Sequence, residues 1–382
     1  MTKKLYDYDS YATQFEAVVI SCQKEGNQYK TVLNQTIFFP EEGGQCCDRG
    51  TVNGVEITHV ELRGDTIYHY SDTPFEEGVS VSGEIDFKTR FRNMQNHSGE
   101  HIICGVAHKL FGCNNVGFHL GADYVTMDLD CYISDDDIKK IELLANEAVI
   151  KNMPVTARYP SEDELMELDY RAKGEIDGNV RVVTIGDVDS CACCAPHVKM
   201  TGEIGMIKIL DAIHYKGGMR LNILCGFDAL KDYHKRLEHT MEISSLISVK
   251  QDEVADGVRK LLSDMAHLRA KLGEKNKQLA GSIIDKIEYS QNPVCIFLDD
   301  ADASLLRHAA NDAKEKTGAF AVVLSGSDNG GYKYIIISGD SDVSEITRQA
   351  NTALGGRGGG KGNMSSGTFK STGEKIKEYF CR

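Results

Sequence analysis

Between Gln14 and Phe87, hydrophobic and polar residues alternate with a period of two, which is the pattern of half-buried β-strands. The turn signals Gly26-Asn27 and Asn53-Gly54 divide this region. The predicted strands cover residues 15–21, 29–39, 55–62, 66–70 and 79–87. Several short strands at close spacing favour a small β-barrel, closed or nearly closed. The alternative is an open sheet that packs on the next domain.

From Thr89 the hydrophobic period changes from two to that of an α-helix, with Gly112 as a stop signal after Phe111. The positions that define this helix are Phe91, Met94, Ile102, Val106 and Leu110. A second helix is predicted over residues 134–151, with Ser134 as its N-cap. Strand-like patterns occur at residues 124–129, 180–185 and 204–210. This region is expected to form one α+β domain.

Residues 228–280 contain no proline and no strand pattern, and their hydrophobic residues recur at spacings of three and four. The repeat comprises Val254, Val258, Leu261, Met265, Leu268 and Leu272. We interpret the segment as a long helix or helical hairpin that acts as a spacer and as a homodimer contact. Two helices packed on their own domain are the alternative.

The last hundred or so residues alternate between strand and helix patterns, as expected for a separate small α/β domain. Predicted strands cover 294–298, 319–324 and 334–337, and predicted helices cover 303–316, 344–354 and 372–380. A glycine-dense loop is expected at residues 355–362. The predicted division is therefore 1–88, 89–227, 228–282 and 283–382.

The chain has 382 residues and a formal net charge of -14, which excludes a generally basic nucleic-acid coat. A nucleic-acid partner would have to bind a local basic patch. No apolar stretch is long enough to cross a bilayer, and the N-terminus lacks the pattern of a secretory signal. Twelve cysteines in such a chain are expected to be free thiols of a cytoplasmic protein, some of them metal ligands, rather than a disulfide framework.

Two short motifs carry residues that suit a metal ion. His97 and His101 lie four residues apart in the predicted helix, so both imidazoles can reach one ion from the same face. Cys193 and His197 repeat this spacing on a tight turn. Three nitrogens and one sulfur suit one Zn²⁺ per chain in tetrahedral geometry. The neighbouring Cys191 and Cys194 leave the identity of the sulfur ligand open.

Glu100 stands between the two helix histidines and supports a second interpretation. A carboxylate beside zinc can move protons during ester or amide hydrolysis. His97, Glu100 and His101 also follow the order of inverzincin peptidases, whose third ligand would be a downstream acid such as Glu175. The Cys193/His197 pair argues against a peptidase, which does not need it.

Together with a stretch near the N-terminus, these motifs resemble the editing domain of alanyl-tRNA synthetase and its free-standing relatives, the AlaX trans-editing proteins. That stretch, residues 36–50, reads TIFFPEEGGQCCDRG and is similar to the family's Thr-x-Phe-Tyr-Pro-x-x-Gly-Gly-Gln-x-x-Asp-x-Gly signature. Gly43 and Gly44 permit positive φ and close backbone approach, and Thr36 and Gln45 offer polar groups to a ligand. The resemblance implies that the Thr36 hydroxyl recognises a serine side chain. The turn departs from the family, because Cys194-Ala195-Pro196 stands where Gly-Gly-Thr is more common.

The segment 354–367 resembles the end of the DHH-associated domain of long AlaX proteins, which is linked to binding the tRNA body. From Gly355 to Arg382 there are six basic and two acidic residues, a net charge of +4. Arg357 and Lys361 are therefore expected to bind tRNA, together with Gly43 and Gly44 at the editing site.

The resemblance implies a fold of four parts: a small N-terminal β-barrel, an α+β zinc-dependent editing domain, a helical spacer and a C-terminal DHH-associated α/β domain. The implied activity is hydrolysis, in trans, of tRNA(Ala) wrongly charged with serine or glycine. Thr36, Gln45 and Glu100 are the expected catalytic-site residues. A non-catalytic tRNA-binding protein with structural zinc is a further alternative.

Overall fold

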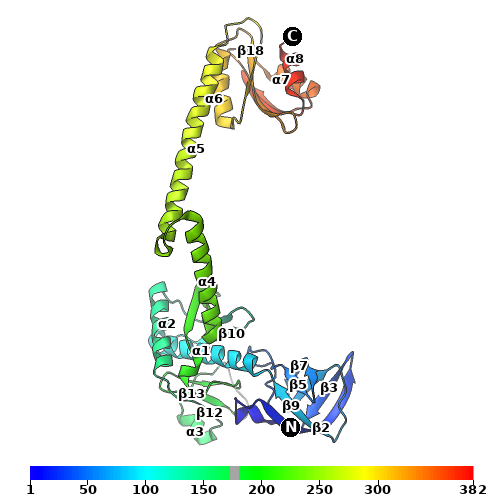
Figure 1. Cartoon of the computed structure of the whole chain (residues 1–382), viewed down its shortest axis with the longest axis vertical. Helices are drawn as coiled ribbons and strands as arrows, with labels where there is room; N and C mark the ends of the chain where they lie inside the picture. The colour runs from blue at the N-terminus through cyan, green and yellow to red at the C-terminus, as the bar shows by residue number, and fades with distance from the viewer. Residues whose placement is uncertain (173–179, 382) are drawn as a thin grey trace. The chain divides into compact units, whose positions relative to one another are not determined.

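The long strand β2 (Gln14–Glu25) organises the N-terminal sheet, because its two halves pair with different neighbours. Its first half is antiparallel to β9 (Ser80–Ile85), and beyond a register shift at Val19 its second half pairs with β3 (Gln28–Leu33). The computed structural model describes residues 1–172 and 180–381. Figure 1 shows the chain, which divides into two compact units, Met1–His239 and Thr240 onward.

The N-terminal sheet has seven antiparallel strands in the order β6-β5-β9-β2-β3-β8-β7, and it nearly closes on itself. The remaining strands are β5 (Gly50–Val52), β6 (Val55–Ile57), β7 (His59–Arg63) and β8 (Thr66–Ser71). The edge strands β6 and β7 are joined by Thr58, whose amide donates to the carbonyl of Tyr70 in β8 at 2.8 Å. A short parallel pair, β1 (Lys3–Lys4) and β4 (Gln35–Thr36), adds to this region. The nearly closed form of the predicted barrel is therefore the one observed.

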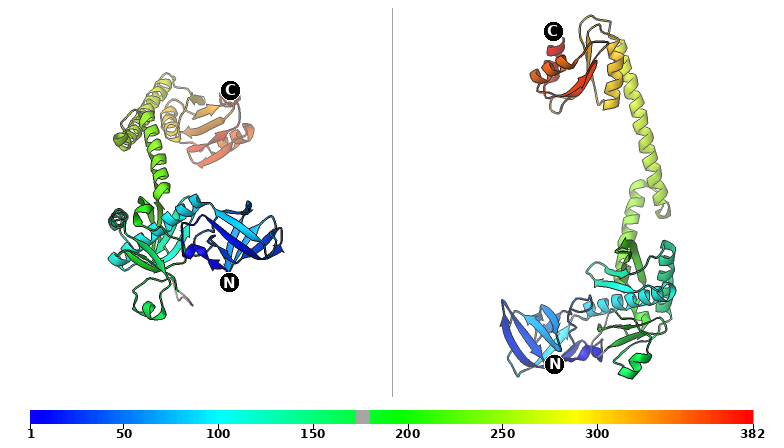
Figure 2. Two further views of the ribbon diagram at one scale, coloured as in Figure 1. Left: turned by 60° about the horizontal axis from the view of Figure 1, so that its bottom comes forward. Right: turned by 180° about the vertical axis from the view of Figure 1, so that it is seen from behind.

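Helix α1 (Phe87–Phe111) connects the sheet to the rest of the first unit. The carboxylate of Asp86 caps its first turn, and Gly112 ends it in the left-handed conformation, as predicted. Seen from behind, the N-terminal sheet and α2 (Asp135–Ile150) lie at opposite ends of α1 (Figure 2). The Ser134 hydroxyl accepts from the Asp137 amide at the start of α2, which confirms the predicted cap.

Two smaller sheets and two further helices complete the described part of this unit. A four-stranded sheet has the order β10 (Asn115–Leu120), β11 (Val125–Leu129), β16 (Gly218–Cys225) and β15 (Ile207–Tyr215). A three-stranded sheet has the order β12 (Val155–Arg158), β13 (Val182–Ile185) and β14 (Asp189–Ala192). The helices are α3 (Glu162–Glu167) and α4 (Gly226–Ile247), which continues into the second unit. Cys113 and Cys131 form a disulfide that joins the two ends of the β10–β11 hairpin, so the prediction of free thiols is wrong for this pair.

The second unit contains α5 (Val254–Asp285) and a five-stranded sheet. The sheet order is β17 (Val294–Leu298), β18 (Phe320–Ser327), β19 (Gly331–Ser338), β21 (Met364–Phe369) and β20 (Arg357–Lys361), and only the β17–β18 pair is parallel. The helices beside it are α6 (Ala303–Lys314), α7 (Ser344–Ala353) and α8 (Gly373–Phe380). The predicted helical seam on α5 is solvent-exposed, with Leu268 at 63% and Leu272 at 61%.

Alternate residues of β18 and β19 contribute to two separate hydrophobic cores in this unit. On one face, Val323 and Ile335 pack with alanines of α6, among them Ala309, Ala310 and Ala313. On the other face, Tyr334 packs with Phe369 and Phe380. The alternation follows from the period of two in a strand.

The glycine-dense segment is a strand rather than the predicted loop. Strand β20 pairs with β21 at the edge of the sheet, and a Cβ on Gly360 would collide with the carbonyl oxygen of Met364. Glycine therefore allows a close approach of the two backbones. The pattern of side chains could not reveal this strand, because these glycines have none. Within residues 1–172 and 180–381, none of the helices combines the length and apolar character needed to span a bilayer.

Arg90 on α1 is fully buried and joins the helix to the loop of residues 37–50, which we call the signature loop. Its guanidinium forms an ion pair with Asp48 and also donates to the carbonyl of Ile37 at 2.6 Å. Asp48 in turn accepts from the Phe39 amide at 2.6 Å. The buried charges are thus paired and hydrogen-bonded on both sides.

Replacing Arg90 by alanine should therefore leave the Asp48 carboxylate buried without its partner. We expect Arg90→Ala to lower the free energy of unfolding of the first unit by about 3–5 kcal/mol. Urea-induced unfolding of the full chain measures this change. Arg49→Ala is the matched control, because Arg49 is exposed, and equal unfolding midpoints for the two variants would contradict the expectation.

Candidate metal centre

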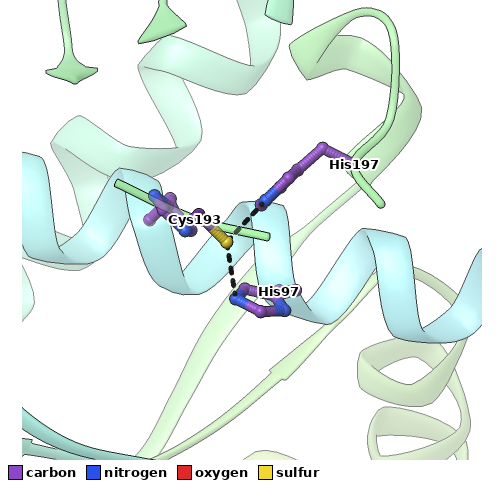
Figure 3. A group of neighbouring side chains, drawn as sticks. His97, Cys193 and His197 are labelled. Atoms are coloured by element: carbon purple, nitrogen blue, oxygen red, sulfur yellow. Dashed lines mark hydrogen bonds between the residues drawn. The ribbon is translucent and has the colours of Figure 1, made fainter. Parts of the chain in front are cut away.

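Four side chains from two distant segments converge in the first unit. Helix α1 supplies His97 and His101, and the turn after β14 supplies Cys193 and His197. One candidate ligand atom from each lies within 4.8 Å of every other. The Cys193 Sγ is 3.6 Å from Nε2 of His97 and 3.4 Å from Nε2 of His197 (Figure 3). The structure thus brings together the four residues that the sequence proposed as one metal site.

A different side chain holds the outer nitrogen of each imidazole. Nδ1 of His97 lies 2.9 Å from Oε1 of Gln45, and Nδ1 of His197 lies 3.0 Å from the Ser98 hydroxyl. Nδ1 of His101 lies 2.9 Å from Oδ2 of Asp189. All three rings are nearly fully buried. With Nδ1 engaged, Nε2 of each ring is left for the centre, which is the usual arrangement of metal-binding histidines.

The local charges favour the ligand forms of two of these groups. Burial alone would raise the pKa of the Cys193 thiol, but the imidazoles of His97 and His197 hold it well below its ordinary value. Burial lowers the pKa of His197 to about 4, which favours the neutral form of its imidazole. A thiolate and neutral imidazoles are the forms that bind metal ions.

His101 and Asp189 shift each other's pKa in opposite directions. Burial alone would lower the pKa of His101, but the carboxylate of Asp189 and the sulfur of Cys193 raise it well above its ordinary value. Burial alone would raise the pKa of Asp189, but His101 and Arg171 lower it. Asp189 is therefore ionised, and its negative charge favours a proton on the imidazole of His101.

The two neighbouring cysteines differ from Cys193 in position and charge. Burial raises the pKa of the Cys191 thiol, and burial together with the nearby Cys193 raises that of Cys194. Neither belongs to the group of four donors. Cys191 instead joins His101 and Asp189 in a second group of donor atoms.

A cavity of about 360 Å³ lies beside three of the four donor residues. Its walls include His97, His101 and Cys193 from the centre, and Glu42 and Gly43 from the signature loop. Lys4, Tyr159 and Arg181 also line it. The cavity can therefore bring a small ligand against the donor atoms.

Glu100 is also a wall residue of this cavity and is almost fully buried. Its Oε1 accepts hydrogen bonds from the Asn115 amide and from the Cys104 thiol, the latter at 3.1 Å. The third ligand suggested for a peptidase, Glu175, lies outside the described residues. Within those residues, the group of donor atoms that contains both helix histidines is completed by Cys193 and His197.

The signature loop places its residues at different depths. Gly43 lines the cavity, and Gly43 and Gly44 both have positive φ, as predicted. Thr36, just before the loop, is fully buried, and its hydroxyl lies 2.9 Å from Nε2 of His69 and accepts from the Phe38 amide at 3.1 Å. Thr36 does not line the cavity, so its contact with a ligand stays a prediction.

Sequence reasoning missed several residues around the centre. Asp189 contacts His101, Arg171 contacts Asp189, and Ser98 contacts His197. A further missed residue is His69 beside Thr36, whose pKa burial lowers to about 4. Ser98 follows His97 directly, so the motif itself pointed to it, whereas no spacing identified Asp189 or Arg171. Arg357 and Lys361 lie exposed at the two ends of β20 in the second unit.

Two families match parts of the sequence. Residues 180–261 match the family described as Threonyl and Alanyl tRNA synthetase second additional domain, and residues 291–380 match the DHHA1 domain.

Curated relatives match nearly the whole chain. The alanyl-tRNA editing protein AlaX-L of Pyrococcus horikoshii is 28% identical over 98% of this chain and 96% of the relative. The alanyl-tRNA editing protein Aarsd1 of Rattus norvegicus is 30% identical over 92% of this chain and 90% of the relative. An alanine--tRNA ligase of Pyrococcus abyssi is 30% identical, but this chain covers only 43% of it. The chain thus belongs to the family of alanyl-tRNA editing proteins.

Proposed function

We propose that this protein hydrolyses the ester bond between a wrongly attached amino acid and the 3′ end of tRNA(Ala). Serine-charged tRNA is the main substrate of the proposal, and glycine-charged tRNA is the second. The observation that carries it is the group of three imidazoles and one thiol, of which two imidazoles and the thiol line a cavity. The full-length similarity to alanyl-tRNA editing proteins supports the choice of substrate.

One Zn²⁺ per chain suits this donor set, with His97, His101, Cys193 and His197 as its ligands. Imidazole nitrogens and thiolate sulfurs are zinc ligands, four of them complete a tetrahedral shell, and the hydrogen-bonded outer nitrogens fit such a site. When bound, the ion would supply positive charge next to the ester. Because four protein ligands fill a tetrahedral shell, we assign the ion to fixing the shape of the cavity wall against which the substrate lies, rather than to activating water.

Two buried side chains are assigned to ordering the attacking water. Glu100 lines the cavity, and a carboxylate there can hold the proton that the water loses. Gln45 places its Oε1 on His97, which leaves its Nε2 buried without a hydrogen-bond partner among the described residues. This N–H group is a donor available to a water or to a carbonyl oxygen.

Selectivity for serine over alanine is assigned to Thr36. A site that hydrogen-bonds a substrate hydroxyl disfavours an analogue that lacks it. His69 is neutral at pH 7, so its Nε2 can accept from the Thr36 hydroxyl and fix its orientation. Glycine must be separated from alanine by exclusion of a methyl group, which is a weaker effect of about 1–3 kcal/mol.

The zinc assignment predicts that His97→Ala and Cys193→Ala each remove the bound zinc and most deacylation of serine-charged tRNA(Ala). Zinc content measured by elemental analysis and release of serine from charged tRNA test this together. His108→Ala is the matched control, because His108 lies on the same helix but is exposed. Wild-type zinc content and activity in both cavity variants would exclude the site, and zinc-dependent peptide cleavage lost in Glu100→Gln would favour a peptidase instead.

The selectivity assignment predicts that Thr36→Val reduces the preference for serine-charged over alanine-charged tRNA(Ala) by about tenfold, the value of one hydrogen bond. Comparing kcat/KM for the two substrates measures it. Thr36→Ser keeps the hydroxyl and should keep the preference. Equal selectivity in the valine variant and the wild type would remove Thr36 from this role.

The tRNA-binding assignment concerns Arg357 and Lys361 on the exposed strand β20. We expect Arg357→Gln with Lys361→Gln to raise KM for charged tRNA more than it lowers kcat. The slope of log KM against log salt should fall by roughly 1 for each ion pair with a tRNA phosphate that the substitutions remove. Lys271→Gln with Lys275→Gln removes the same charge from exposed positions of α5. An equal effect of both double variants would show that only overall charge matters.

A further inference from the structure

Two groups of donor atoms overlap at His101. The first is the candidate metal centre, and the second consists of His101, Asp189 and Cys191, whose donor atoms also lie within 4.8 Å of one another. All three members of the second group are buried. It is therefore either a second cation site that shares His101 with the first, or a support for the first.

Arg171 distinguishes these two possibilities. Its Nε donates to Oδ1 of Asp189 at 2.8 Å, and its Nη2 donates to Oδ2 at 2.9 Å. One guanidinium therefore binds both carboxylate oxygens, and Oδ2 also receives Nδ1 of His101 at 2.9 Å. A cation bound by Asp189 would lie beside this fixed positive charge and would have to displace one of its hydrogen bonds.

The backbone holds Arg171 against the strand that carries Asp189. The amide of Arg171 donates to the carbonyl of Ser190 at 2.8 Å, and the amide of Ala192 donates to the carbonyl of Arg171 at 2.8 Å. These bonds flank Cys191 on β14, which leads directly to Cys193. Arg171 is thus held beside β14, which carries Asp189 and ends one residue before the sulfur ligand.

We propose that Asp189, clamped by Arg171, is a positioning residue that fixes the ring of His101, and that the second donor group binds no metal ion of its own. The inference rests on the proposed zinc at the four-donor centre. A carboxylate on the outer nitrogen keeps the proton on Nδ1 and aims Nε2 at the ion. Without Asp189, the ring of His101 would not be held in one orientation before the ion binds.

Zinc affinity of the full chain, measured by competition with a chromophoric chelator, tests this proposal. We expect the wild type to bind one zinc, and Asp189→Asn to weaken zinc binding about 10–100-fold. Arg171→Gln should also weaken it, and the Asp189→Asn Arg171→Gln double variant should bind no more weakly than Asp189→Asn alone, because Arg171 acts through Asp189. Asp187→Asn is the matched control, since this exposed acid lies two residues away on the same segment.

Two further measurements separate positioning from general stability and from a second ion. The thermal midpoint of the metal-free chain reports a purely structural role, which would lower the midpoint in Asp189→Asn but leave zinc affinity unchanged. The number of zinc ions per chain in Cys191→Ser reports a second site, and we expect it to equal the wild-type value of one.

Unchanged zinc affinity in Asp189→Asn, additive losses in the double variant, or a second zinc that Cys191→Ser removes would each overturn the proposal. A wild type that binds no zinc would overturn both this inference and the proposed metal. Zinc binding that behaves as expected in a protein that deacylates no charged tRNA(Ala) would overturn the proposed function alone.

Discussion

The buried ion pair of Arg90 and Asp48 is the interaction on which the candidate site depends. It joins the first turn of α1 to the end of the signature loop, and the same loop reaches His97 through Gln45. The loop is thus attached to the helix at two points. Because charges buried this deeply are tolerated only when fully paired, the pair fixes how the N-terminal sheet meets the helix that carries the histidines.

The ligands of the metal centre come from this helix and from the segment that follows β14. Helix α1 fixes two ligands by its regular spacing, and β14 delivers the other two at the end of a sheet. Around them, an amide, a hydroxyl and a carboxylate each hold one imidazole. The ligands therefore come from a helix and from the turn that follows a strand, and the supporting side chains come from three different segments. Such preorganisation suits a site that must hold an ion before the substrate arrives.

Local patterns in the sequence were sufficient to predict the helix that carries His97 and His101 and its end at Gly112. They also indicated that two separated motifs could share one ion. The role of Asp189 could not be predicted, because it depends on how β14 packs against α1. The depth of Thr36 was hidden for the same reason, since its hydroxyl is bonded to a histidine of a distant strand. Strand β20 was missed because glycines carry no side-chain pattern, and only its pairing with β21 defines it.

The two cores on the sheet of the second unit differ in the size of their side chains. One contains the alanines of α6 beside larger aliphatic side chains, and the other contains the aromatic rings of Tyr334, Phe369 and Phe380. A slip of β19 by one residue during folding would turn Tyr334 toward the face that packs on α6 and Ile335 toward the aromatic core. Misregistered pairing of β19 would therefore disturb the packing of both cores at once, which favours the native register of this sheet.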